Sequence, residues 1–197
     1  MTRAERKAEN RAKLLAAARR VFAEKGLAGA TARDIVRETD LATGTFYNYF
    51  EDKEDAFRAV VEEFTGQARL AAREERMQRG VGIEERIYRS YCAYFELAVA
   101  DPEMFELLRR NADAVAMLGS EHFFDGAVRE LADDMREWVE AGELPRDVEP
   151  WLPIVARSVA GGGFQIAAQM AEEGGSDIAA TARFCTRLLL HGLRGID

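Results

Sequence analysis

Residues 43–50 read Thr-Gly-Thr-Phe-Tyr-Asn-Tyr-Phe (TGTFYNYF), a stretch with four aromatic residues and no charge. The rings of Phe46, Tyr49 and Phe50 are spaced so that a helix places them on one face, where they can close a small core. The segment is therefore predicted to be a short amphipathic helix. Its other face carries short or hydrogen-bonding residues: Thr43, Gly44, Thr45, Tyr47 and Asn48.

The residues before this segment predict two more helices. An apolar helical stripe begins at Leu14 and stops at the helix breaker Gly26. Thr31 and Asp34 stand three positions apart in the pattern of a capping box, so a second short helix begins there. The first fifty residues are thus expected to hold three short helices. The last two are joined by a turn of about four residues, which is a helix-turn-helix.

The small polar face of residues 43–50 fits the major groove of DNA, whose base edges display donors, acceptors and thymine methyl groups. Asn48 can pair with adenine, threonine methyls can touch thymine, and Gly44 permits close approach. The predicted base-contacting residues are Thr43, Gly44, Thr45 and Asn48, and the predicted phosphate-contacting residues are Thr31, Tyr47 and Lys53. The alternative is a core helix whose polar face only meets solvent.

Two longer stretches, FAEKGLAGATARDIV from Phe22 and TGTFYNYFEDKEDAF from Thr43, resemble the DNA-binding domain of TetR-family transcriptional regulators. The resemblance covers residues 14–57. Two positions depart from the family pattern. Asp40 stands in the turn where the family usually has glycine, and we expect it to tolerate the left-handed conformation there. Gly44 stands where a longer side chain is common.

The remainder of the chain also reads as helices. Thr43 is expected to cap the helix of residues 43–50, and Asp52 to cap a long helix after it. Apolar stripes predict further helices over about 83–98, from Pro102 toward Leu118, and over 121–141, 151–173 and 176–193, with a loop at 142–150. The expected fold is all-α, with about nine helices. The helix-turn-helix domain occupies residues 1–53, and a larger helical bundle occupies residues 54–197.

Charge is distributed unevenly along the 197 residues, whose net charge is −8. Residues 1–53 hold 11 Lys/Arg and 8 Asp/Glu, whereas the rest hold 16 and 27. This distribution, with a mildly basic residue range 1–53 and an acidic remainder, indicates that residues 1–53 alone bind a polyanion. The basic stretch from Arg3 to Lys13 either carries the first helix toward DNA phosphates or a neighbouring minor groove, or is a solvated chain end.

The last two predicted helices have features that fit an interface with a second copy of the chain. Gly161-Gly162-Gly163 costs a helix roughly 1 kcal/mol per glycine relative to alanine, so the run needs a physical reason. Close approach of another helix, a kink beside a cavity and a break in the helix all fit. The TetR resemblance implies that these helices pair with their copies in a homodimer. The expected interface residues are Trp151, Val155, Val159, Gly162, Ile166, Phe184, Leu188 and Leu189.

The middle of the chain is rich in aromatic and sulfur-containing side chains, which ordinarily fill a core but can also line an apolar pocket. The resemblance implies a small-molecule effector site here, and we expect an apolar or aromatic effector. The candidate residues are Tyr91, Phe95, Met104, Phe105, His122, Phe164 and Gln165.

Other classes of protein fit less well. The chain has two histidines and no metal-binding, nucleotide-binding or catalytic motif, so neither a catalytic site, a cofactor nor a metal is expected. Cys92 and Cys185 are expected to be free thiols in a reducing cytosol. No signal peptide or membrane span is visible, so a cytoplasmic protein is expected. The function expected is that of a ligand-responsive regulator, most often a repressor, which binds a palindromic operator. The alternatives are a helical protein-interaction module or a helical-bundle enzyme.

Overall fold

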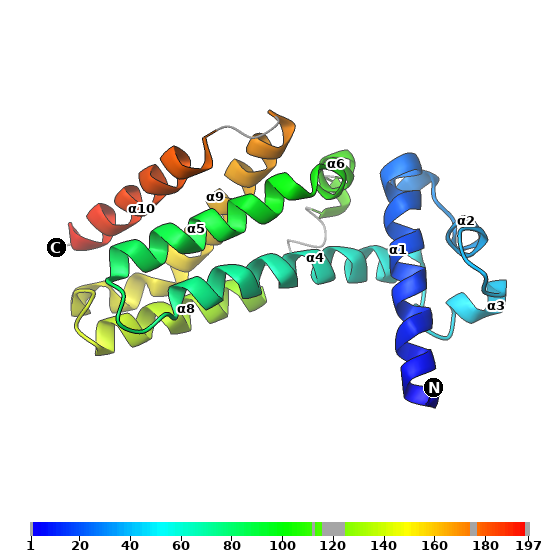
Figure 1. Cartoon of the computed structure of the whole chain (residues 1–197), viewed down its shortest axis with the longest axis horizontal. Coiled ribbons are helices and arrows are strands. Elements are labelled where there is room, and N and C mark those ends of the chain that lie inside the picture. Colours follow the sequence, from blue (N-terminus) through cyan, green and yellow to red (C-terminus); the bar gives the residue numbers. More distant parts are fainter. Residues whose placement is uncertain (1, 112, 116–124, 174–176, 196–197) are drawn as a thin grey trace. The chain divides into compact units, whose positions relative to one another are not determined.

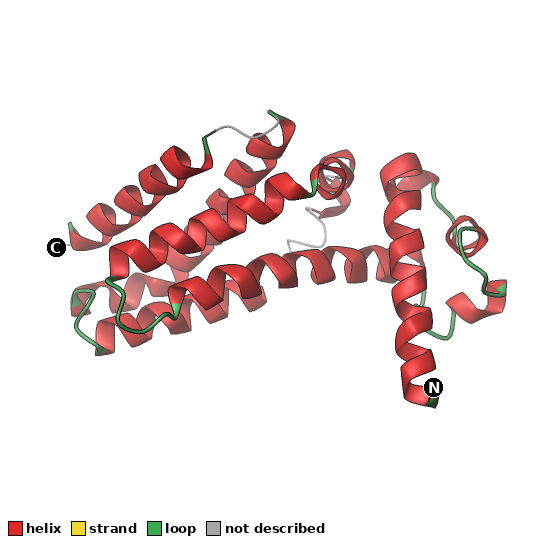
Figure 2. Ribbon diagram, in the orientation of Figure 1, coloured by secondary structure: helices red, strands yellow, loops and turns green. Residues whose placement is uncertain are grey.

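The structure, a computed structural model, describes residues 2–111, 113–115, 125–173 and 177–195, and every regular element within these ranges is helical (Figures 1 and 2). This confirms the all-α class. The elements are α1 (Arg3–Gly29), α2 (Ala32–Arg37), α3 (Thr43–Phe46), α4 (Lys53–Arg76), α5 (Ile83–Ala100), α6 (Pro102–Arg110), α8 (Asp125–Glu140), the 3₁₀ helix η1 (Arg146–Trp151), α9 (Leu152–Glu172) and α10 (Ile178–Arg194).

The described residues form two compact units. The first, called the head below, takes in the residues up to Thr65 and those between Glu103 and Val115. The second, called the body, takes in residues 66–102 and the described residues from Asp125 onward. The domain division predicted after residue 53 remains a prediction, because compactness alone does not assign function.

The core of the head forms where α1, α2, α3 and the start of α4 meet. Phe22 of α1 packs edge-to-face on Phe57 of α4, with ring centroids 5.3 Å apart. Phe46 and Phe50 are buried, as their spacing predicted, and their centroids lie 5.5 Å apart. Tyr49, expected beside them, is half-buried. The aromatic side of residues 43–50 therefore holds α3 on the head.

The first helix is longer than predicted, because α1 already begins at Arg3. Its regular part ends at Gly26, as expected, where φ is 69°, a conformation that glycine adopts without steric cost. The break leaves the N–H of Leu27 free to donate to Asn111 Oδ1 at 2.6 Å. Arg110 donates to two carbonyl oxygens of the same end of α1, at 2.6 and 2.9 Å. These contacts hold the end of α6 within the head.

Local capping signals explain where two helices, α2 and α4, begin. Thr31 and Asp34 form the predicted capping box of α2. Asp52 caps the start of α4 by accepting from the N–H of Asp55 at 2.7 Å. The cap predicted at Thr43 is wrong: Ala42 occupies the N-cap position of α3 without a side-chain hydrogen bond. Thr43 is the first helical residue, which leaves its side chain unused by the helix.

The body packs α5 against α9 and α10, and α8 against α9. Its core includes the fully buried side chains of Met135, Val148 and Leu152. Two expectations change here. Residues 142–150, predicted to be a loop, contain most of η1, and the helix from Pro102, expected to run toward Leu118, ends at Arg110.

A buried ion cluster links α4, α5 and α8 within the body. Asp134 on α8 is completely buried and accepts from Arg76 Nε and Nη2 at 3.1 and 2.9 Å. It also accepts from Arg73 Nε at 3.2 Å. Arg76, itself buried, donates further to Ser90 Oγ at 3.3 Å. Such a cluster is stable only while each charge keeps its partners.

Candidate nucleic-acid interface

The polar face of residues 43–50 is open to solvent. Thr43, Gly44 and Asn48 are exposed, and Thr45 is half-buried. Only Thr43–Phe46 is α-helical, but hydrogen bonds from the N–H groups of residues 48–50 continue the turns as far as Phe50. The side chains of Thr43 and Asn48 form no hydrogen bond within the described residues, so their polar groups are available to a ligand.

Nothing inside the protein requires glycine at position 44. A Cβ atom there would meet no other atom within 4 Å, and the residue does not have a positive φ. A glycine in a helix nevertheless costs up to about 1 kcal/mol relative to alanine. This supports the interpretation that Gly44 admits the close approach of another molecule.

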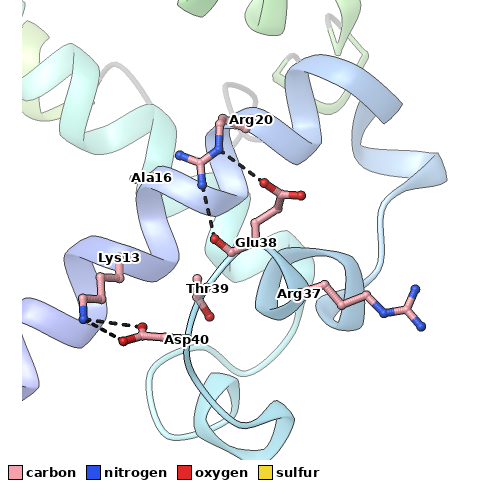
Figure 3. A pocket seen from close by; sticks show the side chains of 7 residues that line it. All are labelled: Lys13, Ala16, Arg20, Arg37, Glu38, Thr39 and Asp40. Atoms are coloured by element: carbon pink, nitrogen blue, oxygen red, sulfur yellow. Dashed lines mark hydrogen bonds and ion pairs between the residues drawn. The ribbon is translucent and has the colours of Figure 1, made fainter.

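The turn before α3 is tied to α1 by charge. Lys13 Nζ lies 3.3 Å from Asp40 Oδ2, and Arg20 contacts both the carbonyl oxygen and the carboxylate of Glu38 at 3.4 and 3.6 Å (Figure 3). The expectation that Asp40 takes a left-handed conformation is wrong, since no described residue other than glycine has a positive φ. Asp40 instead uses its carboxylate to fix the turn on α1.

These side chains surround an open hollow of about 580 Å³, where Arg37 points away from the paired charges (Figure 3). The ion pairs neutralise most of its charge and hold the turn in place. We therefore assign these ion pairs a structural role, which is to hold the turn that leads into α3.

The three predicted phosphate contacts differ in their freedom to bind. The hydroxyl of Tyr47, whose residue is 62% exposed, forms no hydrogen bond within the described part of the chain. Thr31 already uses both its donors on Asp34 Oδ2, at 2.6 Å from the hydroxyl and 3.0 Å from the N–H. The Lys25 ammonium, 2.8 Å from the Asp34 carboxylate, and the Thr31 hydroxyl lower the pKa of Asp34 to about 2.

Lys53 has an internal role that the sequence did not reveal. Its ammonium donates to the carbonyl oxygens of Leu27, Ala28 and Ala30 at 2.8, 3.3 and 3.2 Å. These three bonds use every N–H of the ammonium and cap the end of α1. A phosphate contact by Lys53 would have to replace one of them, so Tyr47 is the best placed of the three candidates.

Comparison with known proteins agrees with this geometry. Residues 14–60, which include α2, α3 and the start of α4, match the sequence profile of bacterial regulatory proteins of the tetR family. The HTH-type transcriptional regulator UidR of Escherichia coli is 28% identical over 144 residues, which cover 70% of each chain. A TetR-family regulator structure from Pectobacterium atrosepticum is 29% identical, with a TM-score of 0.70 over 98% of this chain and 97% of that one.

Residues 14–60 carry the DNA-binding domain of the tetR family. The chain is a DNA-binding transcriptional regulator and, like its relatives, not an enzyme. TetR-family regulators bind DNA and small-molecule ligands and commonly act as dimers. A further structure of the same fold is FadR of Bacillus subtilis in complex with stearoyl-CoA. It is 19% identical, with a TM-score of 0.68 over 91% of this chain and 97% of that one.

In this regulator, the end of η1 and the helices α9 and α10 carry exposed apolar side chains. Phe184, Leu188 and Trp151 are 65%, 64% and 50% exposed. Gly162 is also exposed, whereas the remaining predicted interface residues are half-buried: Val155, Val159, Ile166 and Leu189. Ile154, one position before the predicted Val155 in the first turn of α9, is also 60% exposed, although the sequence analysis did not single it out.

The run Gly161–Gly163 lies inside the continuous helix α9, so the possibility of a break is excluded. A Cβ atom on Gly161 or Gly162 would meet nothing within 4 Å. Gly163 is different, because a Cβ atom there would lie 3.9 Å from the ring of Tyr94. The first two glycines therefore face away from the packed interior of this chain.

The predicted effector residues of this regulator are divided between the units. Tyr91 and Phe95 stack on α5 with ring centroids 5.6 Å apart, and Phe164 is half-buried on α9. Met104 is buried but belongs to the head, and Gln165 is exposed. The Phe105 side chain and all of His122 lie outside the described residues. Among the described members of the set, a ring contact joins Tyr91 and Phe95.

Proposed function

We propose that this protein is a ligand-responsive repressor that binds a palindromic operator as a homodimer and releases it when a small apolar effector binds. Residues 1–53 are the DNA-binding domain, and residues 54–197 hold the effector and dimerisation sites. None of the described helices is long and apolar enough to cross a membrane. We place the protein in the cytoplasm, where its DNA target lies.

One observation carries the DNA-binding part of the proposal. The segment 43–50 buries Phe46 and Phe50 but leaves Tyr47 and Asn48 exposed, with their polar groups unused. A solvated surface helix ordinarily carries charged residues, whereas this face has none. An amide such as that of Asn48 can pair with the N6 and N7 groups of adenine in the major groove.

The decisive experiment measures binding to a duplex that the protein itself enriches from a randomised pool. Asn48→Ala is expected to weaken binding by about 1–3 kcal/mol for each half-site and to relax the preference at one base pair of each half-site. Tyr47→Phe, which removes only the hydroxyl, should weaken the enriched and scrambled duplexes alike. Fluorescence anisotropy gives both affinities.

Gln67→Ala on α4 is the matched control, since it removes an exposed amide outside the proposed interface. Lys53 is unsuited as a probe, because its substitution would also uncap α1. Equal binding by the wild type, N48A and Y47F proteins would refute the assignment of these two residues. Failure to enrich any duplex would refute DNA recognition itself.

The effector proposal rests on the aromatic cluster of the body. Tyr94 lies beside Tyr91 and Phe95, and its ring is 6.0 Å from that of Phe95. Burial raises the pKa of both tyrosines above the ordinary value, which marks their surroundings as poorly hydrated. An apolar or aromatic ligand, or an acyl chain, is the chemistry that such surroundings accept.

Addition of the effector is expected to release bound duplex, because a ligand that prefers one conformation shifts the population toward it. Stearoyl-CoA, the ligand bound to the FadR of Bacillus subtilis, is a suitable first probe. We expect release with stearoyl-CoA and none with coenzyme A alone, measured by loss of anisotropy. Equal release by both compounds would contradict an apolar site, and release by neither would exclude this acyl chain as the effector.

A further inference from the structure

The N-terminal part of α1 is an ordered helix that extends beyond the core of the head. Thr2 and Glu5 form a capping box in which each side chain accepts the backbone N–H of the other, at 2.7 and 3.1 Å. The first buried residue of α1 is Leu14. About three turns of helix, from Arg3 to Lys13, therefore precede the packed part. Their direction is fixed because they continue the same rigid helix.

The apolar stripe of α1 becomes a cationic stripe in these turns. Leu14, Ala17 and Val21 are buried along one face of α1, which packs against α2. Counting back from Leu14 in steps of four and three residues reaches Asn10, Lys7 and Arg3, so these side chains leave the helix on the same face. Arg6 lies next to this row, whereas the acidic residues Glu5 and Glu9 fall on the other side of α1.

A contact within the head supports this register. The guanidinium of Arg11, one turn beyond Lys7, lies 5.7 Å from the centre of the Phe50 ring, at the end of the segment that follows α3. Figure 1 shows α2 and α3 on one side of α1 and the N-terminal end of α1 extending past α3. The cationic stripe is therefore on the side of α1 that carries residues 43–50, which are called the recognition segment below.

The cations of this stripe have no counter-charge within the described residues. Arg3, Arg6 and Lys7 are exposed and form no ion pair there. Lys13 is different, since it pairs with Glu9 at 3.2 Å and with Asp40 at 3.3 Å. Three uncompensated cations in a row are unusual on a chain whose net charge is −8. A row of this kind matches the repeated negative charge of a nucleic-acid backbone.

We propose that Arg3, Arg6 and Lys7 contact phosphates of the duplex beside the base pairs that residues 43–50 read. The N-terminal turns of α1 are then a sequence-independent part of the interface. The inference rests on the proposed DNA-binding function. It extends that function to residues outside the helix-turn-helix, and outside the stretch that matches the tetR family profile.

The salt dependence of binding tests the proposal directly. Each lost phosphate contact lowers the slope of log K against log salt by about 0.9. Because the proposed dimer carries two copies of each residue, the combined variant Arg3→Gln, Arg6→Gln, Lys7→Gln should lose about 5.4 from the slope. The enriched duplex and its scrambled version should weaken by the same factor. The measurement is an anisotropy titration of both duplexes between about 50 and 200 mM salt.

The matched control removes the same charge from the body, through Arg79→Gln, Arg146→Gln and Arg194→Gln. These three arginines are exposed and form no ion pair within the described residues. The control should keep the wild-type slope, whereas an equal loss in both variants would reveal only an effect of net charge and overturn the proposal.

The single variant Lys7→Gln provides a second, gentler test, with an expected loss of about 1.8 in the slope because the dimer loses one contact from each copy. Unchanged slopes in the single and the combined variants, with a wild type that binds duplex normally, would overturn the phosphate contacts and leave the proposed function intact. A wild type that binds no duplex at any salt would instead overturn the proposed function, and this inference with it.

Discussion

Asp134→Ala is expected to lower the free energy of unfolding by about 3–5 kcal/mol. The substitution leaves the guanidinium of Arg76 buried without the carboxylate that receives two of its N–H groups. A buried charge without a partner costs far more than the intact pair contributes. Denaturant unfolding followed by circular dichroism measures the change.

The neighbouring residue supplies the control. Asp133 is exposed and pairs with Arg136 one turn along α8 at 2.5 Å, so Asp133→Ala should cost less than about 1 kcal/mol. The double variant Asp134→Leu, Arg76→Met should recover part of the stability, because it removes both charges. If D134A were no less stable than D133A, the buried ion cluster around Asp134 would not stabilise the fold as we expect.

Introducing charge into the exposed apolar surface of α9 and α10 should separate the proposed dimer. For the double variant Phe184→Glu, Leu188→Glu, we expect light scattering to report half the wild-type mass. Binding to the enriched duplex should fall by roughly 10²–10⁴, because a monomer loses the second half-site contact that a dimer makes at high effective concentration. Two recognition segments must lie about 34–36 Å apart to enter successive turns of the major groove.

Leu70→Glu gives the corresponding control. Leu70 is 58% exposed, which is similar to the two interface residues, but it lies on α4, outside the predicted interface. It should leave both the mass and the duplex affinity unchanged. A wild type that is already monomeric, or a charged double variant that stays dimeric, would contradict the assignment of this surface.

The features that the sequence predicted correctly are local. The capping boxes and the glycine break involve residues a few positions apart, so their chemistry can be recognised without knowing the fold. Thr31 with Asp34, and Asp52 with Asp55, are of this kind. The burial of Phe46 and Phe50 followed from helical spacing alone.

The features that the sequence missed depend on contacts between distant residues. Lys53 reaches carbonyl groups 23 to 26 positions away, and Asn111 reaches Leu27 across 84 positions. The sequence does not show that Asp134 is buried while its neighbour Asp133 is exposed, because charge and spacing do not show which of two neighbouring acids faces inward. The structure decides this through the two arginines of α4.

The proposal that residues 43–50 read DNA has a consequence for how the binding sites of this protein would be found. α3 is a single helical turn, and the polar face around it offers only a handful of side chains to a groove. Each such side chain discriminates at one or two base pairs, so the information content that one copy can extract by hydrogen bonding is small. The rest of the sequence information has to come from the bendability and groove width of the base-pair steps that the protein does not contact. A genome search with a strict consensus would therefore overlook true sites, whereas a search that scores duplex flexibility and two-fold symmetry would rank them highly.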